Sequence, residues 1–362
     1  MPPYRLATLP APFRFHRGGE LPEITLAYET WGTLSPERDN AVLLTTGLSP
    51  GSHARSSADN AAPGWWEEMI GPGRPIDTDR WFVVCNNSLG SCHGSTGPAS
   101  QNPATGERYR LRFPELAVED IAASSRALLH SLGIERLAAV IGSSLGGMTS
   151  LAYATLFPDE VGAVVSISAA TSASAFAIAV RSIQREAIRS DAIWNGGDYE
   201  TPPVHGLTLA RKLGVVSYRS AQEWTERFGR KRVESPARPF GIEFEVEAYL
   251  QHHADRFVPT FDANCYLYLS KAMDEFDLAE HGGEERSVSS ALRRITARRV
   301  LVVGVSSDIL FPLSQQEELA EGLEKTGHDV TFEAFPSPYG HDSFLIDLER
   351  FGPAVERFLG GE

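Results

Sequence analysis

The sequence predicts an α/β fold in which helices cover a mostly parallel β-sheet, and three observations support this. Short β-branched runs such as 41–46 and 163–168 have the uniformly apolar character of strands buried on both faces. Segments with helical spacing of apolar residues separate these runs, and this alternation is typical of parallel strands joined by right-handed crossovers. The third observation is a strand–turn–helix arrangement around residue 144.

That arrangement contains a G-x-S-x-G motif within Leu137 to Ser150, LAAVIGSSLGGMTS. An apolar run ending at Ile141 enters the motif, and a helix-compatible segment leaves it and stops before Pro158. A serine in this setting is the nucleophile elbow of the α/β-hydrolase fold. Its two glycines leave room for a strained turn that lifts the Ser144 hydroxyl above the sheet. The motif therefore predicts an α/β-hydrolase fold with Ser144 as nucleophile.

The other elements are expected in the following order. Residues 21–32 alternate apolar and polar side chains, which predicts a half-exposed first strand. Residues 115–132 carry a helical stripe of apolar residues closed by Gly133. Further strands are predicted at 41–46, 81–85, 139–141, 163–168, 299–305 and 330–335, and a last helix at 353–359.

The pattern changes after residue 172. Residues 173–295 lack short β-branched runs and contain helix-like pieces, such as 176–188 and 243–257, separated by turns. We interpret 173–295 as a helical lid domain inserted into an α/β-hydrolase core made of 1–172 and 296–362.

Composition narrows the class of protein. The chain has 362 residues, of which 42% are hydrophobic and 22% charged, so it can bury a large core. The net charge of −14 argues against nucleic acid or an anionic membrane as a partner. Three cysteines without a C-x-x-C, no signal-like N-terminus and no long apolar run predict a soluble, cytoplasmic protein.

An exposed serine needs a base before it can act as a nucleophile. In this fold an acid and then a histidine follow the serine, each in a loop after a late strand. Asp308 follows the strand at 299–305 and His341 follows the strand at 330–335. Backbone N–H groups of Leu145 and Leu48 are the expected oxyanion hole. The predicted chemistry is acyl transfer through Ser144, to water, an alcohol or an amine. With neither H-E-x-x-H nor a Cys/His cluster, no metal site is predicted.

Nearly the whole chain resembles the homoserine O-acetyltransferase family, and most closely its serine O-acetyl/O-succinyltransferase branch. The resemblance is carried by AYETWG (27–32), DTDRWFVVCNNSLGSCHGSTGPAS (77–100), RFPEL (112–116), GSSLGGM (142–148), SIQREAIRSD (182–191), ARKLGVVSYRS (210–220), NCYLYLSKAMDEFD (264–277), SSDILFP (306–312) and SPYGHDSFL (337–345).

This resemblance implies a ping-pong acyltransferase that uses acetyl-CoA or succinyl-CoA and no metal or redox cofactor. It implies Ser144, Asp308 and His341 as the triad. It further implies that Arg211 binds the carboxylate of L-serine or L-homoserine. Asp342 would bind the ammonium group, and Tyr218 would line the same pocket. The family also implies a homodimer formed through the lid helices.

The sequence departs from the family pattern after the early strand. L-T-G is usual there, whereas this chain has Leu48-Ser49-Pro50. Proline stiffens the loop and adds a ring where glycine leaves space, which favours the shorter serine over homoserine. In the elbow, Leu145 replaces the usual methionine at similar volume, so the turn should persist.

Other functions stay open at this point. These are L-homoserine O-acetylation, ester hydrolysis with the same triad, and a non-catalytic binding role for the fold. Acetyl and succinyl donors are equally open, because a succinyl carboxylate would need a cation that sequence cannot place. Arg55, Arg181 and Arg185 are candidates for that cation.

Overall fold

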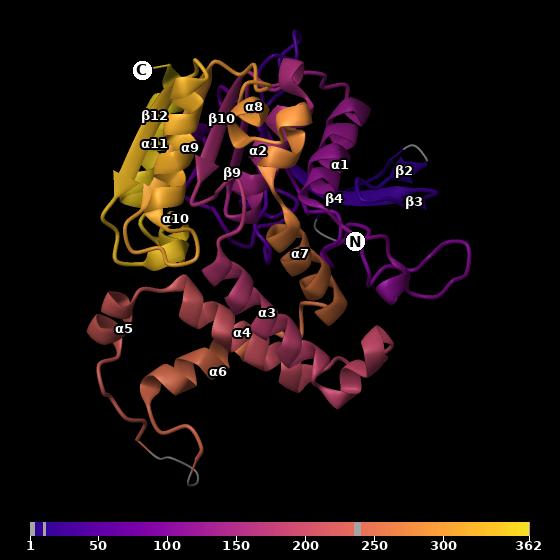
Figure 1. Cartoon of the computed structure of the whole chain (residues 1–362), viewed down its shortest axis with the longest axis vertical. Coiled ribbons are helices and arrows are strands. Elements are labelled where there is room, and N and C mark those ends of the chain that lie inside the picture. Colours follow the sequence, from indigo (N-terminus) through magenta and orange to yellow (C-terminus); the bar gives the residue numbers. More distant parts are fainter. Residues whose placement is uncertain (1–3, 10–11, 235–239, 362) are drawn as a thin grey trace.

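An eight-stranded sheet runs through the centre of the computed structural model, which describes residues 4–9, 12–234 and 240–361 (Figure 1). The strand order is β1-β4-β8-β5-β9-β10-β11-β12. Neighbours from β8 to β12 pair in parallel, whereas β1 with β4 and β4 with β8 are antiparallel. The prediction of a mostly parallel sheet is therefore confirmed. The strands are β1 Arg5–Leu9, β4 Ile24–Trp31, β5 Ala41–Thr45, β8 Phe82–Asn86, β9 Ala139–Ser143, β10 Ala163–Ile167, β11 Arg299–Val305 and β12 Asp329–Phe335.

Helices cover both faces of this sheet. Because side chains alternate along a strand, neighbours such as Leu43 and Leu44 enter two different hydrophobic clusters. One cluster lies under α1 Val118–Ser131, α2 Leu145–Leu156 and α9 Leu313–Lys325. The other lies under α11 Leu348–Gly360, which follows the short α10 Ser343–Ile346. Two small strand pairs, β2 Phe13–Arg14 with β3 Glu20–Leu21 and β6 Ile70–Gly71 with β7 Ile76–Asp77, lie outside the sheet.

The described residues between β10 and β11 are mainly helical. They form α3 Ala175–Arg189, α4 Val204–Tyr218, α5 Ala221–Arg227, α6 Glu245–Phe257, α7 Ala263–Glu275 and α8 Val288–Leu292. Helices α3, α4 and α6 form a layer at one end of the core, and α7 leads back to it (Figure 1). An isolated β-bridge between Ser172 and Asp277 joins the chain just after α7 to the end of the first core segment. Leu292 of α8 is buried in the hydrophobic cluster under α1, α2 and α9.

Two predicted elements differ from the structure. Residues 21–32 are neither the first strand nor half exposed, since β1 precedes them and six of the eight residues of β4 are buried. The reason is that β4 pairs on both edges, with β1 and β8, and both of its faces are covered. The last helix begins at Leu348 rather than at Pro353, which lies inside α11.

The structure also shows the state of the cysteines and whether any helix could cross a membrane. The three cysteines, Cys85, Cys92 and Cys265, are all free thiols. Within the described ranges, every helix is too short or too polar to cross a membrane.

Candidate active site

Ser144 occupies a strained turn between β9 and α2. Its φ of 57° and ψ of −125° place a non-glycine residue in a sparsely populated region. A Cβ atom on Gly142 would lie 2.2 Å from Thr45 Oγ1, and one on Gly146 would lie 2.2 Å from the Thr45 carbonyl oxygen. Only glycine fits at these two positions, because the helix start passes so close to β5. The turn thus needs the residues that flank Ser144 in the sequence motif.

The structure brings Ser144, His341 and Asp308 into one hydrogen-bonded chain. His341 Nε2 lies 2.8 Å from Ser144 Oγ, and His341 Nδ1 lies 2.7 Å from Asp308 Oδ2. A carboxylate only accepts hydrogen bonds, so Nδ1–H donates to Asp308 and Nε2 is left to accept from the serine hydroxyl. Asp308 follows β11 and His341 lies in the turn Gly340–Asp342 after β12, where the sequence predicted them.

Asp308 is fixed by the backbone as well as by the histidine. Its Oδ1 accepts N–H hydrogen bonds from Leu310 at 2.9 Å and Phe311 at 3.0 Å. Its Oδ2 therefore has a single orientation, toward the imidazole. This leaves the carboxylate with no freedom to turn away from His341.

The imidazole of His341 is 4% exposed and lies between aromatic rings. It stacks on Phe311 with ring centroids 5.1 Å apart and meets the ring of Phe344 edge-on at 5.7 Å. Burial lowers the pKa of His341, but the charge and hydrogen bond of Asp308 raise it more, and the resulting pKa lies above its ordinary value. The site thus holds a histidine with strengthened basicity beside a serine hydroxyl.

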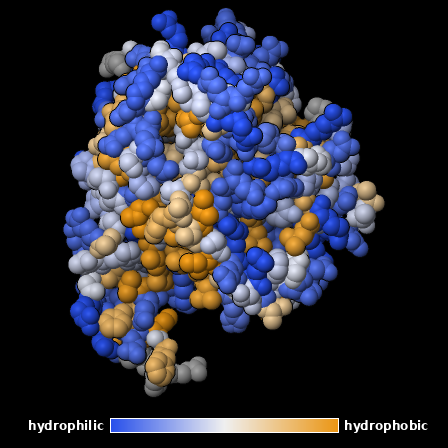
Figure 2. Space-filling model, in the orientation of Figure 1, coloured by the Kyte–Doolittle hydropathy of each residue, from blue (hydrophilic) through white to orange (hydrophobic). Residues whose placement is uncertain are grey.

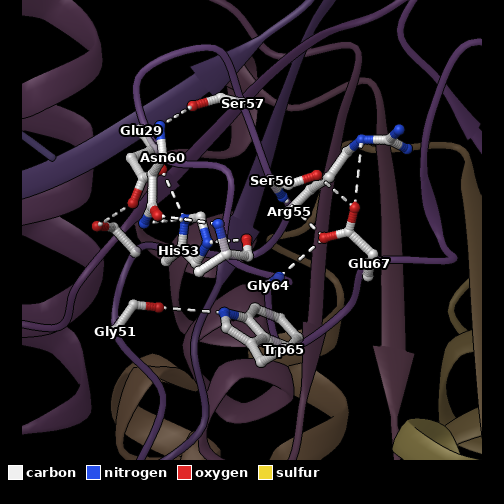
Figure 3. Close-up of polar contacts among 12 residues, drawn as sticks. Glu29, Gly51, His53, Arg55, Ser56, Ser57, Asn60, Gly64, Trp65 and Glu67 are labelled. Carbon is white, nitrogen blue, oxygen red and sulfur yellow. Dashed lines mark hydrogen bonds and ion pairs between the residues drawn. The ribbon is translucent and has the colours of Figure 1, made fainter. Parts of the chain in front are cut away.

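The loop after β5 places Leu48 and Pro50 on the same cavity wall as Ser144 and His341. Figure 3 shows the polar network that supports this loop. The indole of Trp65 donates to the Gly51 carbonyl at 3.1 Å, and His53 Nδ1 lies 2.9 Å from the Glu29 carboxylate (Figure 3). These contacts tie the loop to β4 and to the segment around residue 65.

A second set of contacts in this network centres on Glu67. Its carboxylate accepts backbone N–H groups of Ser56 and Gly64, both at 2.8 Å, and the Ser56 hydroxyl (Figure 3). Burial raises the pKa of Glu67, but these hydrogen bonds outweigh it and lower the pKa to about 2. The loop is thereby held by an ionised carboxylate throughout the physiological pH range.

A cavity opens above Ser144, with about 920 Å³ of empty space that includes its mouth to solvent. Core loops form one side, and residues of α3, α4 and α7 form the other. Seven of the predicted site residues line it: Leu48, Pro50, Ser144, Arg211, Tyr218, His341 and Asp342. Asp308 lies behind His341. The side chain of Leu145 is buried, and as the first residue of α2 its backbone N–H lies at the helix start beside Ser144.

Arg211 and Asp342 differ in how they are paired. The Arg211 guanidinium lies 4.6 Å from the ring centroid of Phe257, and its Nε is buried without a hydrogen-bond partner among the described residues. Asp342 Oδ2 lies 3.1 Å from Arg219 Nε, an ion pair that the sequence did not predict. Burial raises the pKa of Asp342, and the charge of Arg219 opposes this.

Sequence reasoning missed several residues of the cavity wall. These are Gln184 of α3, Tyr266 and Met273 of α7, and Trp65, whereas Arg181, which the sequence offered as a candidate cation for a succinyl group, lines the cavity as well. A signal was available, because Arg181 and Gln184 are three residues apart and Tyr266 and Met273 seven apart, so each pair shares a helix face. Arg55 and Arg185 are not among the described residues that line the cavity. The Arg55 guanidinium donates instead to the Ile70 carbonyl.

One group in the described ranges has donor atoms suited to a metal ion. His16, Glu119 and His281 offer ligand atoms within 4.8 Å of one another. His281 Nε2 lies 2.8 Å from Glu119 Oε1. These residues are distant in sequence, so spacing alone could not indicate them, and they do not line the cavity above Ser144.

Comparison with known proteins shows the family of this chain. Residues 40–348 match the family model described as alpha/beta hydrolase fold. A protein of Litchfieldella anticariensis named serine O-succinyltransferase is 55% identical over 360 residues, covering 98% of both chains. The crystal structure of homoserine O-acetyltransferase from Bacillus anthracis has a TM-score of 0.90 at 30% identity, covering 98% of this chain and 97% of that one.

A second solved structure, of esterase E22, has a TM-score of 0.89 at 30% identity, covering 98% of this chain and 99% of that one. The fold is thus shared by acyltransferases and esterases. The curated relatives over the full length are the more similar in sequence. The chain belongs to the α/β-hydrolase fold family and, within it, is an acyltransferase of the homoserine O-acetyltransferase family, on the branch that contains the serine O-succinyltransferases.

Proposed function

We propose that this enzyme transfers a succinyl group from succinyl-CoA to the hydroxyl of L-serine by a ping-pong mechanism. The observation that carries the proposal is the hydrogen-bonded chain of Ser144, His341 and Asp308 beneath a cavity lined by Arg211, whose Nε is buried without a hydrogen-bond partner among the described residues. The name of the relatives that are about 55% identical supports this choice of donor and acceptor. Acetyl-CoA and L-homoserine are the alternative substrates.

In the first half-reaction, His341 takes the proton of Ser144 as the serine oxygen attacks the thioester carbonyl. The carbon–sulfur bond breaks, the proton passes to the sulfur, and CoA leaves with its thiol. Asp308 holds the imidazole tautomer and stabilises the imidazolium. Backbone N–H groups of Leu145 and Leu48 stabilise the oxyanion of each tetrahedral intermediate.

In the second half-reaction, His341 takes the hydroxyl proton of the acceptor, whose oxygen attacks the acyl carbonyl. The ester bond to Ser144 then breaks, and His341 gives the proton to the serine oxygen. Arg211 binds the acceptor carboxylate, since a guanidinium offers a two-pronged hydrogen-bonding group for it. Asp342, already paired with Arg219, binds the ammonium group, and Tyr218 packs beside the acceptor. Pro50 lines the cavity and reduces the space for the extra methylene of homoserine.

Release of CoA, followed with a thiol reagent, tests this proposal. Acetyl-CoA and succinyl-CoA are each combined with L-serine, L-homoserine and no acceptor. We expect the largest kcat/KM for succinyl-CoA with L-serine. Equal release without acceptor would make water the acceptor and the protein an esterase. A kcat/KM for homoserine equal to that for serine would remove the role given to Pro50.

The raised pKa of His341 predicts the pH dependence of the reaction. Only neutral His341 accepts a proton, so kcat/KM should fall as the pH drops through the pKa of the histidine. Because Asp308 raises this pKa above 6.5, the midpoint of the acidic limb should lie above pH 6.5. A pH series of kcat/KM for the acyl-CoA measures it. A midpoint at or below 6.5 would contradict the prediction.

We also propose a homodimer formed through the helical layer, which acts as a lid over the cavity. Apolar side chains are exposed on α3 and α4, and Figure 2 shows apolar surface where the core meets this layer. Phe176 and Ile183, and likewise Leu209 and Val216, are seven residues apart and so share a helix face. Contiguous apolar surface of this kind marks an association site.

Introducing charge on this surface should separate the two copies. Ile183 and Leu209 are 55% and 57% exposed, so Ile183→Glu with Leu209→Glu should fold normally as a monomer. Light scattering after size exclusion gives the mass. Leu6→Glu on the edge strand β1, where leucine is 54% exposed, is the matched control and should stay dimeric. A wild-type protein that is monomeric at micromolar concentration would refute the proposal.

The proposed reaction needs no metal or redox cofactor, because its steps use only groups of the chain and its two substrates. In the proposed enzyme, residues 173–295 serve as the lid domain of a core formed by 1–172 and 296–362. The product, an O-acyl amino acid, is an activated ester for sulfur-amino-acid synthesis in the cytoplasm.

A further inference from the structure

We propose that His16, Glu119 and His281 bind a divalent transition-metal ion, with Zn²⁺ as the best-matched ion, and that this ion stabilises the fold. The site is separate from the cavity above Ser144, whose lining includes none of the three residues. The proposal is independent of the acyl transfer described above, since no step of that reaction uses these side chains.

The fold brings the three side chains together from separate segments of the chain. His16 lies in the turn between β2 and β3, Glu119 in the first turn of α1, and His281 at the end of the short 3₁₀ helix Leu278–His281. Each offers one ligand atom, and these atoms all lie within 4.8 Å of one another. Figure 1 shows the β2–β3 pair beside α1. An ion bound here would join the N-terminal hairpin, α1 and the segment that follows α7.

The donor set suits zinc. Two imidazole nitrogens and one carboxylate oxygen are a known combination of protein ligands for Zn²⁺, with water as the fourth ligand. With bonds of about 2.0 to 2.2 Å, the ligand atoms of a four-coordinate ion are roughly 3.3 Å apart. His281 Nε2 and Glu119 Oε1 are 2.8 Å apart, and the ring centroids of His16 and His281 are 5.7 Å apart. The exposed His16 side chain therefore needs only a small movement to complete the site.

Glu119 has a buried oxygen that the protein leaves unused. The residue is 3% exposed, and its Oε1 contacts His281. Its Oε2 is buried without a hydrogen-bond partner among the described residues. A buried carboxylate oxygen without a partner is unfavourable, and a bound cation would remove that cost. This oxygen is thus a second observation, besides the grouping of ligand atoms, that indicates a cation.

Basic side chains do not supply that cation. Asp120 is 2% exposed and adjoins Glu119, and within the described ranges no lysine or arginine nitrogen lies within 4.0 Å of either carboxylate. Arg17, next to His16, pairs instead with Glu275 at 3.5 Å and Glu280 at 3.9 Å. Because buried charge is costly unless it is compensated, two adjacent buried carboxylates favour a divalent cation beside them.

The backbone around the site is already held in place. Asp120 Oδ1 accepts the backbone N–H of His16 at 2.7 Å, and its Oδ2 accepts that of Ala117 at 2.8 Å. Arg294 donates to the backbone carbonyl of His281 at 3.3 Å. Binding therefore requires adjustment of side chains alone. When the ion binds, His281 Nε2 releases its proton to Nδ1 of the same ring or to solvent, and its lone pair coordinates the metal.

Metal content and thermal stability of the full chain test the site. The protein is stripped with a chelator, dialysed and loaded with Zn²⁺. We expect one bound Zn²⁺ per chain after gel filtration, measured by inductively coupled plasma mass spectrometry. At free Zn²⁺ about 100-fold above Kd, Tm should rise by about 3 °C or more. Mg²⁺ should give neither result, because it prefers oxygen ligands. Neither readout requires turnover, so the result does not depend on the proposed reaction.

His16→Ala and His281→Gln each remove one ligand. Their affinity for Zn²⁺, measured by titration calorimetry, should fall at least about 10-fold, since even the loss of an outer partner of a ligand typically costs 10- to 100-fold. The side chain of His16 is exposed, so His16→Ala should keep the Tm of the metal-free wild type. His281→Gln keeps an N–H group that can donate to Glu119.

His130→Ala is the matched control. His130 lies on the same helix as Glu119, and its Nε2 is 3.3 Å from Glu160 Oε2, but no third ligand joins this pair in the part of the chain that the structure describes. Its affinity for Zn²⁺ should equal that of the wild type. An affinity that stays unchanged in His16→Ala and His281→Gln, or falls equally in His130→Ala, would place the zinc elsewhere and overturn the inference. A wild-type protein that retains no zinc after gel filtration would overturn it as well.

Discussion

Replacing Ser144 by alanine is expected to lower kcat for acyl transfer by about 10⁴-fold or more, the loss typical of a removed nucleophile. Without the hydroxyl there is no covalent intermediate, although the cavity, the oxyanion donors and His341 remain. CoA release with succinyl-CoA and L-serine measures the rate. Mass spectrometry of the intact protein should show an acyl-enzyme in the wild type and none in the variant.

The neighbouring hydroxyl provides the control for this experiment. Ser143 is the last residue of β9 and lines the same cavity, but it has no place in the hydrogen-bonded chain. Ser143→Ala should therefore keep the acyl-enzyme. Ser144→Ala combined with His341→Ala should be no slower than either single variant, because residues that act as a unit are not additive. A Ser144→Ala variant that still accumulates acyl-enzyme would reject this serine as the nucleophile.

The central part of the site could be predicted because each residue carries a local signal. Ser144 is identified by the glycines on either side, which the close approach of Thr45 requires. Asp308 follows the continuous apolar run of β11, and His341 follows β12, where apolar and polar residues are mixed, so the order of the strands along the chain indicated both places. The sheet was predictable for the same reason, since buried parallel strands are short, continuous apolar segments.

What could not be predicted depends on contacts between distant segments. The pairs of Asp274 with Arg181 and of Asp342 with Arg219 join residues far apart in sequence. An arginine on a helix is usually a surface residue, and only the packing of α3 on α7 shows that Arg181 is buried. The strand β1 was missed because its residues RLATL are too few and too mixed to indicate a strand without its partner β4.

The second large effect is expected for Asp308→Asn, which should lower kcat by about 10⁴-fold by fixing the wrong histidine tautomer. The backbone decides the orientation of the new amide. Two N–H groups, of Leu310 and Phe311, point at Oδ1, and only an oxygen can accept them. The amide nitrogen must then face His341 Nδ1 and donate to it. Nδ1 becomes the acceptor, Nε2 carries the proton, and His341 can no longer take a proton from Ser144.

The tautomer is a direct readout that loss of stability alone would not produce. Nitrogen NMR of the histidine ring should place the proton on Nδ1 in the wild type and on Nε2 in Asp308→Asn. The same substitution at the exposed Asp329, at the start of β12, is the control and should change neither the rate nor the ring. An Asp308→Asn variant with a wild-type tautomer but a much lower rate would mean that the charge of Asp308, rather than its orientation of the ring, supports catalysis. A variant with unchanged rate would remove Asp308 from the mechanism.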